Sequence, residues 1–230
     1  PHPRPPAAIR GMIADYYRYI SHLDAQVGRV LDALEASPFA RNTIVVFAAD
    51  SGVARGSHGL IGKQNLYELD SVRVPLIIGG PGIPAGKRTD AMCYLFDVLP
   101  TLGRLCSVPG PTTSEGLDLS ATLKDPATPA RPHLIFAYRN IQRAVRDERW
   151  KLIRYPLVDR TQLFDLQTDP REMNDLAGKP EHAAKVAEMT ALLQKEMDHL
   201  GDTAPLRVAN PQPAEWRPRT GDARPGKKQR

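Results

Sequence analysis

Two polar segments, thirteen residues apart, carry the side chains of this sequence best suited to bind a cation and an anion. Asp50 directly follows an apolar, β-branched run at residues 42–49. A carboxylate beyond the carboxyl end of a strand is well placed to bind a hard cation through oxygen, and an aspartate there can equally cap the next turn. Lys63 lies among glycine and polar residues, and its compact ammonium charge suits a phosphate or sulfate group. The alternative is an ordinary lysine that faces solvent.

Histidine and serine side chains between these two positions suggest further chemistry. His58 sits in a glycine-flanked loop, where it either contacts a substrate or holds the loop together. Neither Ser51 nor Ser57 lies in a Gly-x-Ser-x-Gly turn, which exposes the nucleophile in α/β-hydrolases. The sequence therefore argues against a serine hydrolase.

The two cysteines, Cys93 and Cys106, do not have the spacing of a metal-binding cluster. Two cysteines are also too few to staple a chain of this length. Both lie among apolar residues, so we predict two buried thiols.

The elements that must position these side chains alternate between helix and strand. Residues 9–36 and 97–105 have helical spacing of apolar residues, and residues 42–49 and 72–78 read as strands on either side of a glycine-rich loop. A run that is apolar on both faces is typical of a buried parallel strand. We therefore expect an α/β fold in which 44–49 is a central strand of a mostly parallel sheet sandwiched by helices.

The pattern changes after residue 106. Residues 107–132 are rich in proline and are predicted to be a linker. Four short candidate strands separated by turn residues then predict an antiparallel meander, at residues 133–138, 141–146, 150–155 and 162–166. The amphipathic segment 181–200 is predicted to be a helix that covers this sheet. Residues 1–106 would then be part of a larger α/β domain, and residues 133–200 a small α+β subdomain.

Composition and charge limit the classes of partner. The chain has 230 residues, 41% hydrophobic and 25% charged, as expected of a globular protein of one domain or slightly more. Residues 201–230 hold seven basic and three acidic residues, so they account for +4 of the net charge of +5. We expect this proline-rich tail to be disordered, with few packed contacts, and nucleic-acid binding is the weaker alternative. No apolar run approaches the roughly 18 residues of a membrane span, so no membrane partner is expected.

Several motifs follow one another in a specific order. They are Asp50-Ser51-Gly52, Ser57-His58-Gly59-Leu60, Gly62-Lys63-Gln64-Asn65-Leu66-Tyr67-Glu68, Val72-Arg73-Val74-Pro75-Leu76-Ile77-Ile78, Trp150-Lys151-Leu152-Ile153-Arg154-Tyr155 and Asp169-Pro170-Arg171-Glu172. In this order they closely resemble the C-terminal half of the sulfatase family, whose members share the alkaline-phosphatase-like fold. The resemblance covers roughly residues 9–200.

The resemblance implies a calcium-dependent hydrolase of sulfate esters. In that family a formylglycine, made from Cys or Ser in a Cys/Ser-x-Pro-x-Arg motif, attacks sulfur while calcium polarises the sulfate oxygens. By this resemblance Asp50 and Ser51 occupy metal-ligand positions, Lys63 contacts the sulfate, and His58 is a further candidate for substrate contact. The substrate would be a sulfated small molecule or sugar. A phosphodiesterase or phosphonate hydrolase of the same superfamily, or a non-catalytic binding segment, are the alternatives.

The sequence also departs from the family pattern. It has no Cys/Ser-x-Pro-x-Arg motif, since Cys106-Ser107-Val108-Pro109 has its proline one place late and no arginine after it. The family's N-terminal pair of aspartates is absent, Ser51 stands where the family has Asn or His, and Glu68-Leu69-Asp70-Ser71 is one residue longer than the family's Tyr-Glu-x-Ser run. The chain begins at Pro1 rather than at methionine. We therefore expect about half of an enzyme, which on its own neither hydrolyses sulfate esters nor binds calcium tightly; compartment and oligomeric state are left open.

Overall fold

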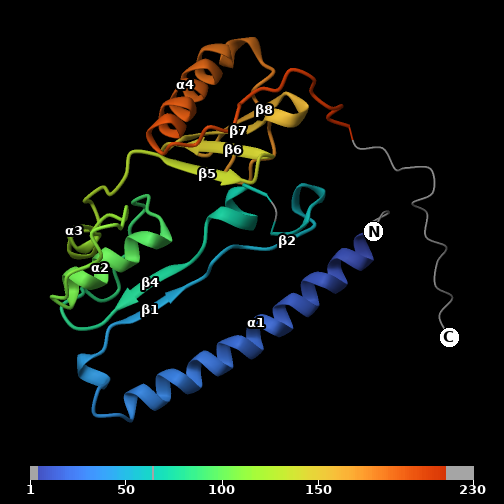
Figure 1. The fold of residues 1–230 in the computed structure, drawn as a ribbon. Coiled ribbons are helices and arrows are strands. Elements are labelled where there is room, and N and C mark those ends of the chain that lie inside the picture. The colour runs from blue at the N-terminus through green and yellow to red at the C-terminus, as the bar shows by residue number, and fades with distance from the viewer. Residues whose placement is uncertain (1–4, 64, 216–230) are drawn as a thin grey trace.

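The computed structural model describes residues 5–63 and 65–215 (Figure 1). Its N-terminal part consists of one long helix, α1 (Pro6–Glu35), and four short strands, β1 (Val45–Ala48), β2 (Ala54–Arg55), β3 (Ile61–Gly62) and β4 (Leu76–Gly79). Two short helices follow, α2 (Val98–Leu105) and α3 (Ser120–Lys124). The C-terminal part holds β5 (Leu134–Tyr138), β6 (Gln142–Arg146), β7 (Trp150–Tyr155), β8 (Arg160–Asp165) and α4 (Ala183–His199).

Strand β1 confirms the position of the predicted strand but not its pairing. It pairs with β4 alone among the described residues, and the pairing is antiparallel, with Val46 opposite Ile78. The prediction of a central parallel strand is therefore wrong within this part of the chain. Parallel neighbours need a crossover that returns to the start of the strand, whereas residues 49–75 turn back through the short β2–β3 hairpin and a helical turn. An apolar run shows that a strand is present without showing its direction.

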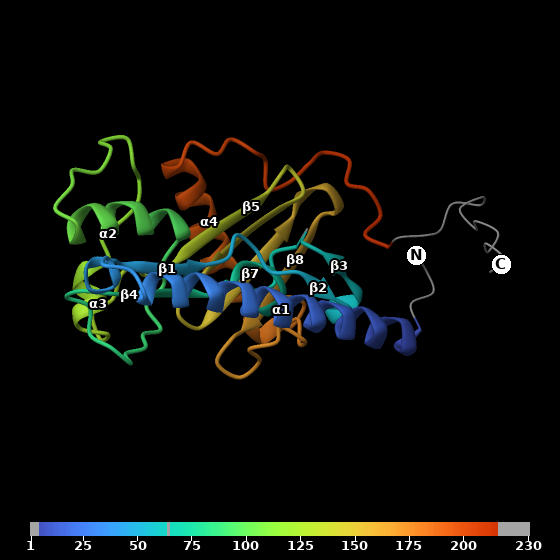
Figure 2. The same ribbon diagram turned by 90° about the horizontal axis from the view of Figure 1, so that it is seen from below.

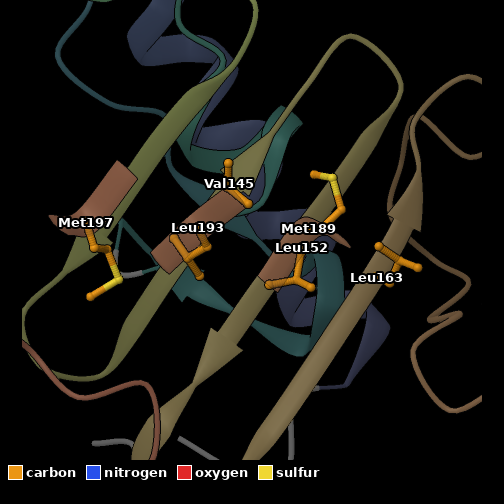
Figure 3. Packing of buried hydrophobic residues seen from close by; sticks show 6 residues of the cluster. All are labelled: Val145, Leu152, Leu163, Met189, Leu193 and Met197. Atoms are coloured by element: carbon orange, nitrogen blue, oxygen red, sulfur yellow. The ribbon is translucent and has the colours of Figure 1, made fainter. Parts of the chain in front are cut away.

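The C-terminal meander is confirmed, with the strand order β5-β6-β7-β8 and all neighbours antiparallel. Alternate side chains of these strands point to opposite faces, so each strand contributes to two layers. One face packs against α4 through a fully buried cluster (Figure 3), formed by Val145, Leu152, Leu163, Met189, Leu193 and Met197. The predicted helix therefore covers the predicted sheet.

The opposite face of the same sheet supports the loop that follows β3. Leu66 and Tyr67 are buried there against Ala144, Ile153 and Phe164. The segment that resembles the sulfatase lysine motif is thus attached to the C-terminal sheet rather than to β1 and β4. This loop is therefore positioned by β7, which lies more than 80 residues further along the chain.

Helix α1 confirms the helix predicted over 9–36, but none of its residues is buried. It runs alongside β1 and β4 in both views (Figures 1 and 2), and Tyr16 contacts the guanidinium of Arg55 at 5.0 Å from the ring centre. Large apolar side chains on it are exposed, among them Tyr17, Tyr19, Ile20, Leu23, Val30 and Leu31. None of the helices in the described part of the chain combines the length and apolar character needed to cross a membrane.

Three smaller expectations need correction. The two thiols are not buried: Cys93 is only half-buried, and Cys106 is exposed. Cys106 is the residue that follows the C-terminal end of α2. The predicted linker 107–132 contains the short helix α3. The first part of the predicted tail is packed, since Ala204 and Leu206 lie against the α4 cluster and the Leu206 carbonyl accepts a hydrogen bond of 2.7 Å from Arg154. Residues 216–230 of the tail lie outside the described residues.

Candidate active site

The structure brings Asp50 and Lys63 together just beyond the end of β1. The Lys63 Nζ lies 2.9 Å from Oδ1 and 3.1 Å from Oδ2 of Asp50. The loop between them forms the β2–β3 hairpin, and this turn returns Lys63 to the strand end. The pair is open to solvent, with the side chains of Asp50 and Lys63 83% and 49% exposed. Both groups are therefore accessible to a ligand from solvent.

The lysine also favours the ionised form of the aspartate. The hydrogen bond and the positive charge of Lys63 hold the pKa of Asp50 below its usual value. Asp50 is therefore a carboxylate throughout the neutral range. In this form it offers oxygen atoms to a cation, while the neighbouring ammonium offers protons to an anion.

Gly52 and Ser71 hold the two halves of this site against each other. The Gly52 N–H donates to the Ser71 carbonyl at 2.9 Å, and the Ser71 hydroxyl donates to the Lys63 carbonyl at 3.1 Å. The backbones approach so closely that a Cβ on Gly52 would lie 2.6 Å from the Asp70 carbonyl oxygen. Only glycine fits this position, which accounts for the glycine that follows Asp50 and Ser51.

Replacing Gly52 with alanine is expected to destabilise the chain by about 1–3 kcal/mol, as for other overpacked sites, because the Asp70–Ser71 backbone would have to move. Urea unfolding measures this loss. Gly28→Ala is the matched control: a Cβ at Gly28 in α1 meets nothing within 4 Å, and alanine favours a helix over glycine by roughly 1 kcal/mol. Equal unfolding midpoints for the two variants would contradict the close approach at Gly52.

The extra residue in the Glu68–Ser71 run does not pull Ser71 away from the site. Residues Glu68–Val72 form a single π-helical turn, in which the Val72 N–H donates to the Tyr67 carbonyl at 3.2 Å. A π-turn accommodates one more residue than an α-turn between fixed ends. The additional residue is thereby absorbed, and Leu69 in this turn points toward solvent.

His58 is held by an aromatic contact. Its ring stacks on that of Tyr67, with ring centres 3.7 Å apart and planes only 2° from parallel. The Tyr67 hydroxyl in turn lies 3.0 Å from the Oε1 of Gln162 on β8. This arrangement gives His58 a structural role in the loop, and a contact to substrate stays a prediction.

A buried cluster of charged side chains next to the site was not predicted from the sequence. Lys151 on β7 is 0% exposed, and its Nζ lies 3.0 Å from Glu68 Oε1 and 2.9 Å from Glu172 Oε1. Arg146 on β6 donates to the other oxygen of Glu68 at 2.8 Å. The alternation of β7 does place Lys151 on the same face as Ile153 and Tyr155, and this was the one available signal. The partners, 83 and 21 residues away, leave no trace in the local pattern.

The described residues provide only part of a calcium site. Ca²⁺ takes six to eight oxygen ligands, and here they are limited to the Asp50 carboxylate and the half-buried Ser51 hydroxyl, which lies 3.2 Å from the Gly52 carbonyl. Within residues 5–63 and 65–215, no group of three or more His, Cys, Asp or Glu side chains could hold a metal ion. The assignment of Asp50 and Ser51 as metal ligands therefore stays a prediction.

Comparison with protein families shows to which family the chain belongs. Residues 3–108 match the family described as "Sulfatase", and residues 56–199 match "N-sulphoglucosamine sulphohydrolase, C-terminal". The second match alone spans more than half of the chain. This chain belongs to the sulfatase family. The match to the sulfatase family includes both Asp50 and Lys63, so the site lies within the part of the chain that family members share.

Individual sulfatases agree with this assignment. The chain is 33% identical over 204 residues to the N-acetylglucosamine-6-O-sulfatase of Bacteroides thetaiotaomicron, and 34% identical over 193 residues to the choline-sulfatase of Rhizobium meliloti. These alignments cover 83% and 80% of this chain but 36% of each relative. The chain thus spans little more than a third of the length of these sulfatases.

Solved structures confirm the alkaline-phosphatase-like fold of the sulfatases. A 2-O GAG sulfatase superposes with a TM-score of 0.76 at 32% identity, covering 85% of this chain and 44% of that one. A protein in complex with its substrate D-glucosamine-2-N,6-O-disulfate superposes with a TM-score of 0.74 at 30% identity, covering 81% and 40%. The phosphonate monoester hydrolase of Agrobacterium radiobacter follows with 0.70 at 26% identity, covering 82% and 42%.

Proposed function

We propose that the complete protein hydrolyses sulfate esters, with Asp50 as a metal ligand and Lys63 as a sulfate contact. The observation that carries the proposal is the 2.9 Å approach of Lys63 Nζ to Asp50 Oδ1 at the end of β1. It gathers an oxygen donor for a cation and a proton donor for an anion at one solvent-open point. A sulfate ester needs both, because negative charge grows on its leaving and non-bridging oxygens as the S–O bond breaks.

The two residues would divide the work by charge. Lys63, held beside Asp50 and attached to the Ser71 hydroxyl through its carbonyl, would donate to a sulfate oxygen and offset its charge. Asp50, an ionised carboxylate whose pKa is lowered, would be a ligand of the cation, with Ser51 as a weaker neighbour. A calcium ion bound there would supply Lewis-acid polarisation of the sulfate oxygens.

The nucleophile belongs, in this proposal, outside residues 1–230. The sequence contains no Cys/Ser-x-Pro-x-Arg motif from which a formylglycine would form. The described residues also supply too few oxygen ligands to complete a calcium site. We therefore expect the chain alone to be inactive and to bind calcium weakly.

The proposed substrate class is a sulfated sugar. Two observations support this class: the relative named N-acetylglucosamine-6-O-sulfatase and the similar structure that holds D-glucosamine-2-N,6-O-disulfate. The similarity to a choline-sulfatase supports a small sulfated alcohol as a second candidate substrate. Hydrolysis of a phosphonate monoester is the alternative reaction, supported by the similarity to the Agrobacterium radiobacter enzyme at 26% identity.

The test compares two proteins and three substrates. The protein expressed from its complete coding sequence should hydrolyse 4-nitrophenyl sulfate and release sulfate from glucosamine 6-sulfate, and residues 1–230 alone should do neither. Calorimetry on residues 1–230 should show calcium binding weaker than millimolar, because one carboxylate and one hydroxyl are far from six ligands. Faster turnover of a phenyl phosphonate monoester than of either sulfate would replace the proposed reaction by the alternative. Sulfate release by residues 1–230 would contradict the placement of the nucleophile.

A further inference from the structure

The buried cluster around Lys151 carries no net charge. It combines two positive side chains, Lys151 and Arg146, with two negative ones, Glu68 and Glu172. The Lys151 ammonium donates hydrogen bonds to the Leu66 carbonyl and to one oxygen of Glu68. It also forms an ion pair with Glu172 Oε1 at 2.9 Å, although that oxygen accepts no hydrogen bond. Burial raises the pKa of Glu172, and the charge of Lys151 is the main influence that opposes this. The charged state of each member therefore depends on the others.

Several contacts of this cluster reach the segment that follows Lys63. Lys151 binds the Leu66 carbonyl and the Glu68 side chain. The second oxygen of Glu172 accepts the Glu68 backbone N–H at 2.6 Å. Leu66 is thus held at its backbone carbonyl, and Glu68 at both its backbone N–H and its carboxylate. The groups that hold them come from β7 and from the turn after β8.

A short path leads from the cluster to the site. Glu68 begins the π-helical turn that ends at Val72, and Ser71 in this turn donates its hydroxyl to the Lys63 carbonyl at 3.1 Å. The Ser71 carbonyl accepts the Gly52 N–H at 2.9 Å, two residues after Asp50. Whatever fixes the start of the turn therefore also fixes the separation of Lys63 from Asp50.

We propose that Lys151 and Glu172 are positioning residues, which lock the segment 65–72 on the C-terminal sheet and thereby hold the Lys63 ammonium beside Asp50. The inference rests on the proposed function of Lys63, and it extends the site to the sheet far along the chain. It also gives the C-terminal sheet a role in the reaction without any contact to the substrate. Simple hydrophobic packing of Leu66 and Tyr67 would hold the segment without four buried charges, whose desolvation is costly.

The first test measures order in the segment directly. Lys151→Met keeps the length of the side chain and removes its charge, so it leaves both glutamates without their shared partner. Hydrogen–deuterium exchange of the peptide covering 65–72 should become at least about tenfold faster, since its backbone bonds would open more often. Ser71→Ala is the milder second variant: it removes only the hydroxyl that donates to the Lys63 carbonyl, and it should speed exchange around Lys63 without altering the cluster.

Arg143→Met is the matched control for Lys151→Met. Arg143 lies on β6 of the same sheet and pairs with Asp202 at 2.6 Å, and its hydrogen bonds go to Asp202, Arg139 and Gln142. The substitution Arg143→Met therefore removes a buried ion pair that makes no contact with the segment 65–72. Exchange in 65–72 that stays at the level of the parent protein in Lys151→Met would overturn the proposal, whatever the activity of the protein.

The second test asks whether the cluster acts through Lys63. In the protein expressed from its complete coding sequence, Lys151→Met should lower kcat/KM for 4-nitrophenyl sulfate about 10–100-fold, as expected for a reacting group displaced by roughly 1 Å. In a Lys63→Ala background the same substitution should cost less than about threefold. Equal losses in both backgrounds would show a general structural role and overturn the proposal. If the parent protein hydrolyses no sulfate ester, the proposed function fails, and the exchange measurement still decides the positioning.

Discussion

Asp50→Ala should abolish sulfate-ester hydrolysis by the complete protein, to below about one part in 10⁴ of the parent rate. Asp50 lies just beyond the end of β1 with an exposed carboxylate, and Lys63 lowers the pKa of this carboxyl further below neutral pH. In the proposed site the cation would then lose a charged ligand, and Lys63 would lose its ion-pair partner. Steady-state assays with 4-nitrophenyl sulfate, together with calcium titration of the same protein, measure both effects.

Asp90→Ala is the control for this result, because it removes another exposed aspartate from the same part of the chain. It should leave both turnover and calcium affinity unchanged. Asp50→Asn should be intermediate, since the amide keeps one oxygen ligand but not the charge. Activity of Asp50→Ala within tenfold of the parent protein would exclude Asp50 from the metal site and would leave it as a turn residue.

Lys63→Ala should lower kcat/KM by about two to four powers of ten, the usual cost of losing one charged donor to a transition-state oxygen. Calcium affinity should stay the same or rise slightly, because the variant removes a positive charge 2.9 Å from the Asp50 carboxylate. The pKa of Asp50 should return toward its usual value, with the carboxylate still ionised at pH 7. The two variants thus separate sulfate binding from metal binding.

Lys87→Ala provides the matched comparison, since Lys87 is an exposed lysine away from the site motif. Lys63→Arg should recover part of the activity, because arginine keeps the charge but changes the geometry of donation. A loss of calcium affinity in Lys63→Ala, or activity equal to that of Lys87→Ala, would contradict the assignment of Lys63 to the sulfate.

Local sequence patterns predicted those elements of this fold whose pattern of apolar residues matches the face that they bury. The meander over β5–β8 follows from short alternating runs between turn residues, and α4 from a single apolar stripe. The direction of β1 did not follow, because its apolar run is compatible with parallel and antiparallel partners alike. In the structure β1 is also less covered than the run suggests, with Phe47 41% exposed.

The site shows the same division between near and distant information. The approach of Lys63 to Asp50 could be anticipated, because thirteen loop residues easily fold back over a strand end. The partners of Lys151 could not, since Glu68 lies 83 residues away and charge alone says nothing about burial. The positive φ of 55° at Glu172 could not be predicted from the sequence either, because it depends on the turn that follows β8. Long-range ionic contacts and backbone strain depend on how the sheet and the loop pack in three dimensions, and local sequence patterns do not contain this information.

The two-stranded sheet of β1 and β4 has a practical consequence for handling the chain. Each of these strands has one edge without a partner among the described residues, and Phe47 and Ile77 add exposed apolar surface beside those edges. Unpaired strand edges with apolar side chains act as templates for adding strands from other molecules. Concentrated solutions of residues 1–230 are therefore exposed to aggregation that begins at β1 or β4. Charged substitutions such as Ile77→Lys offer a way to prevent it without touching Asp50, Lys63 or the Lys151 cluster.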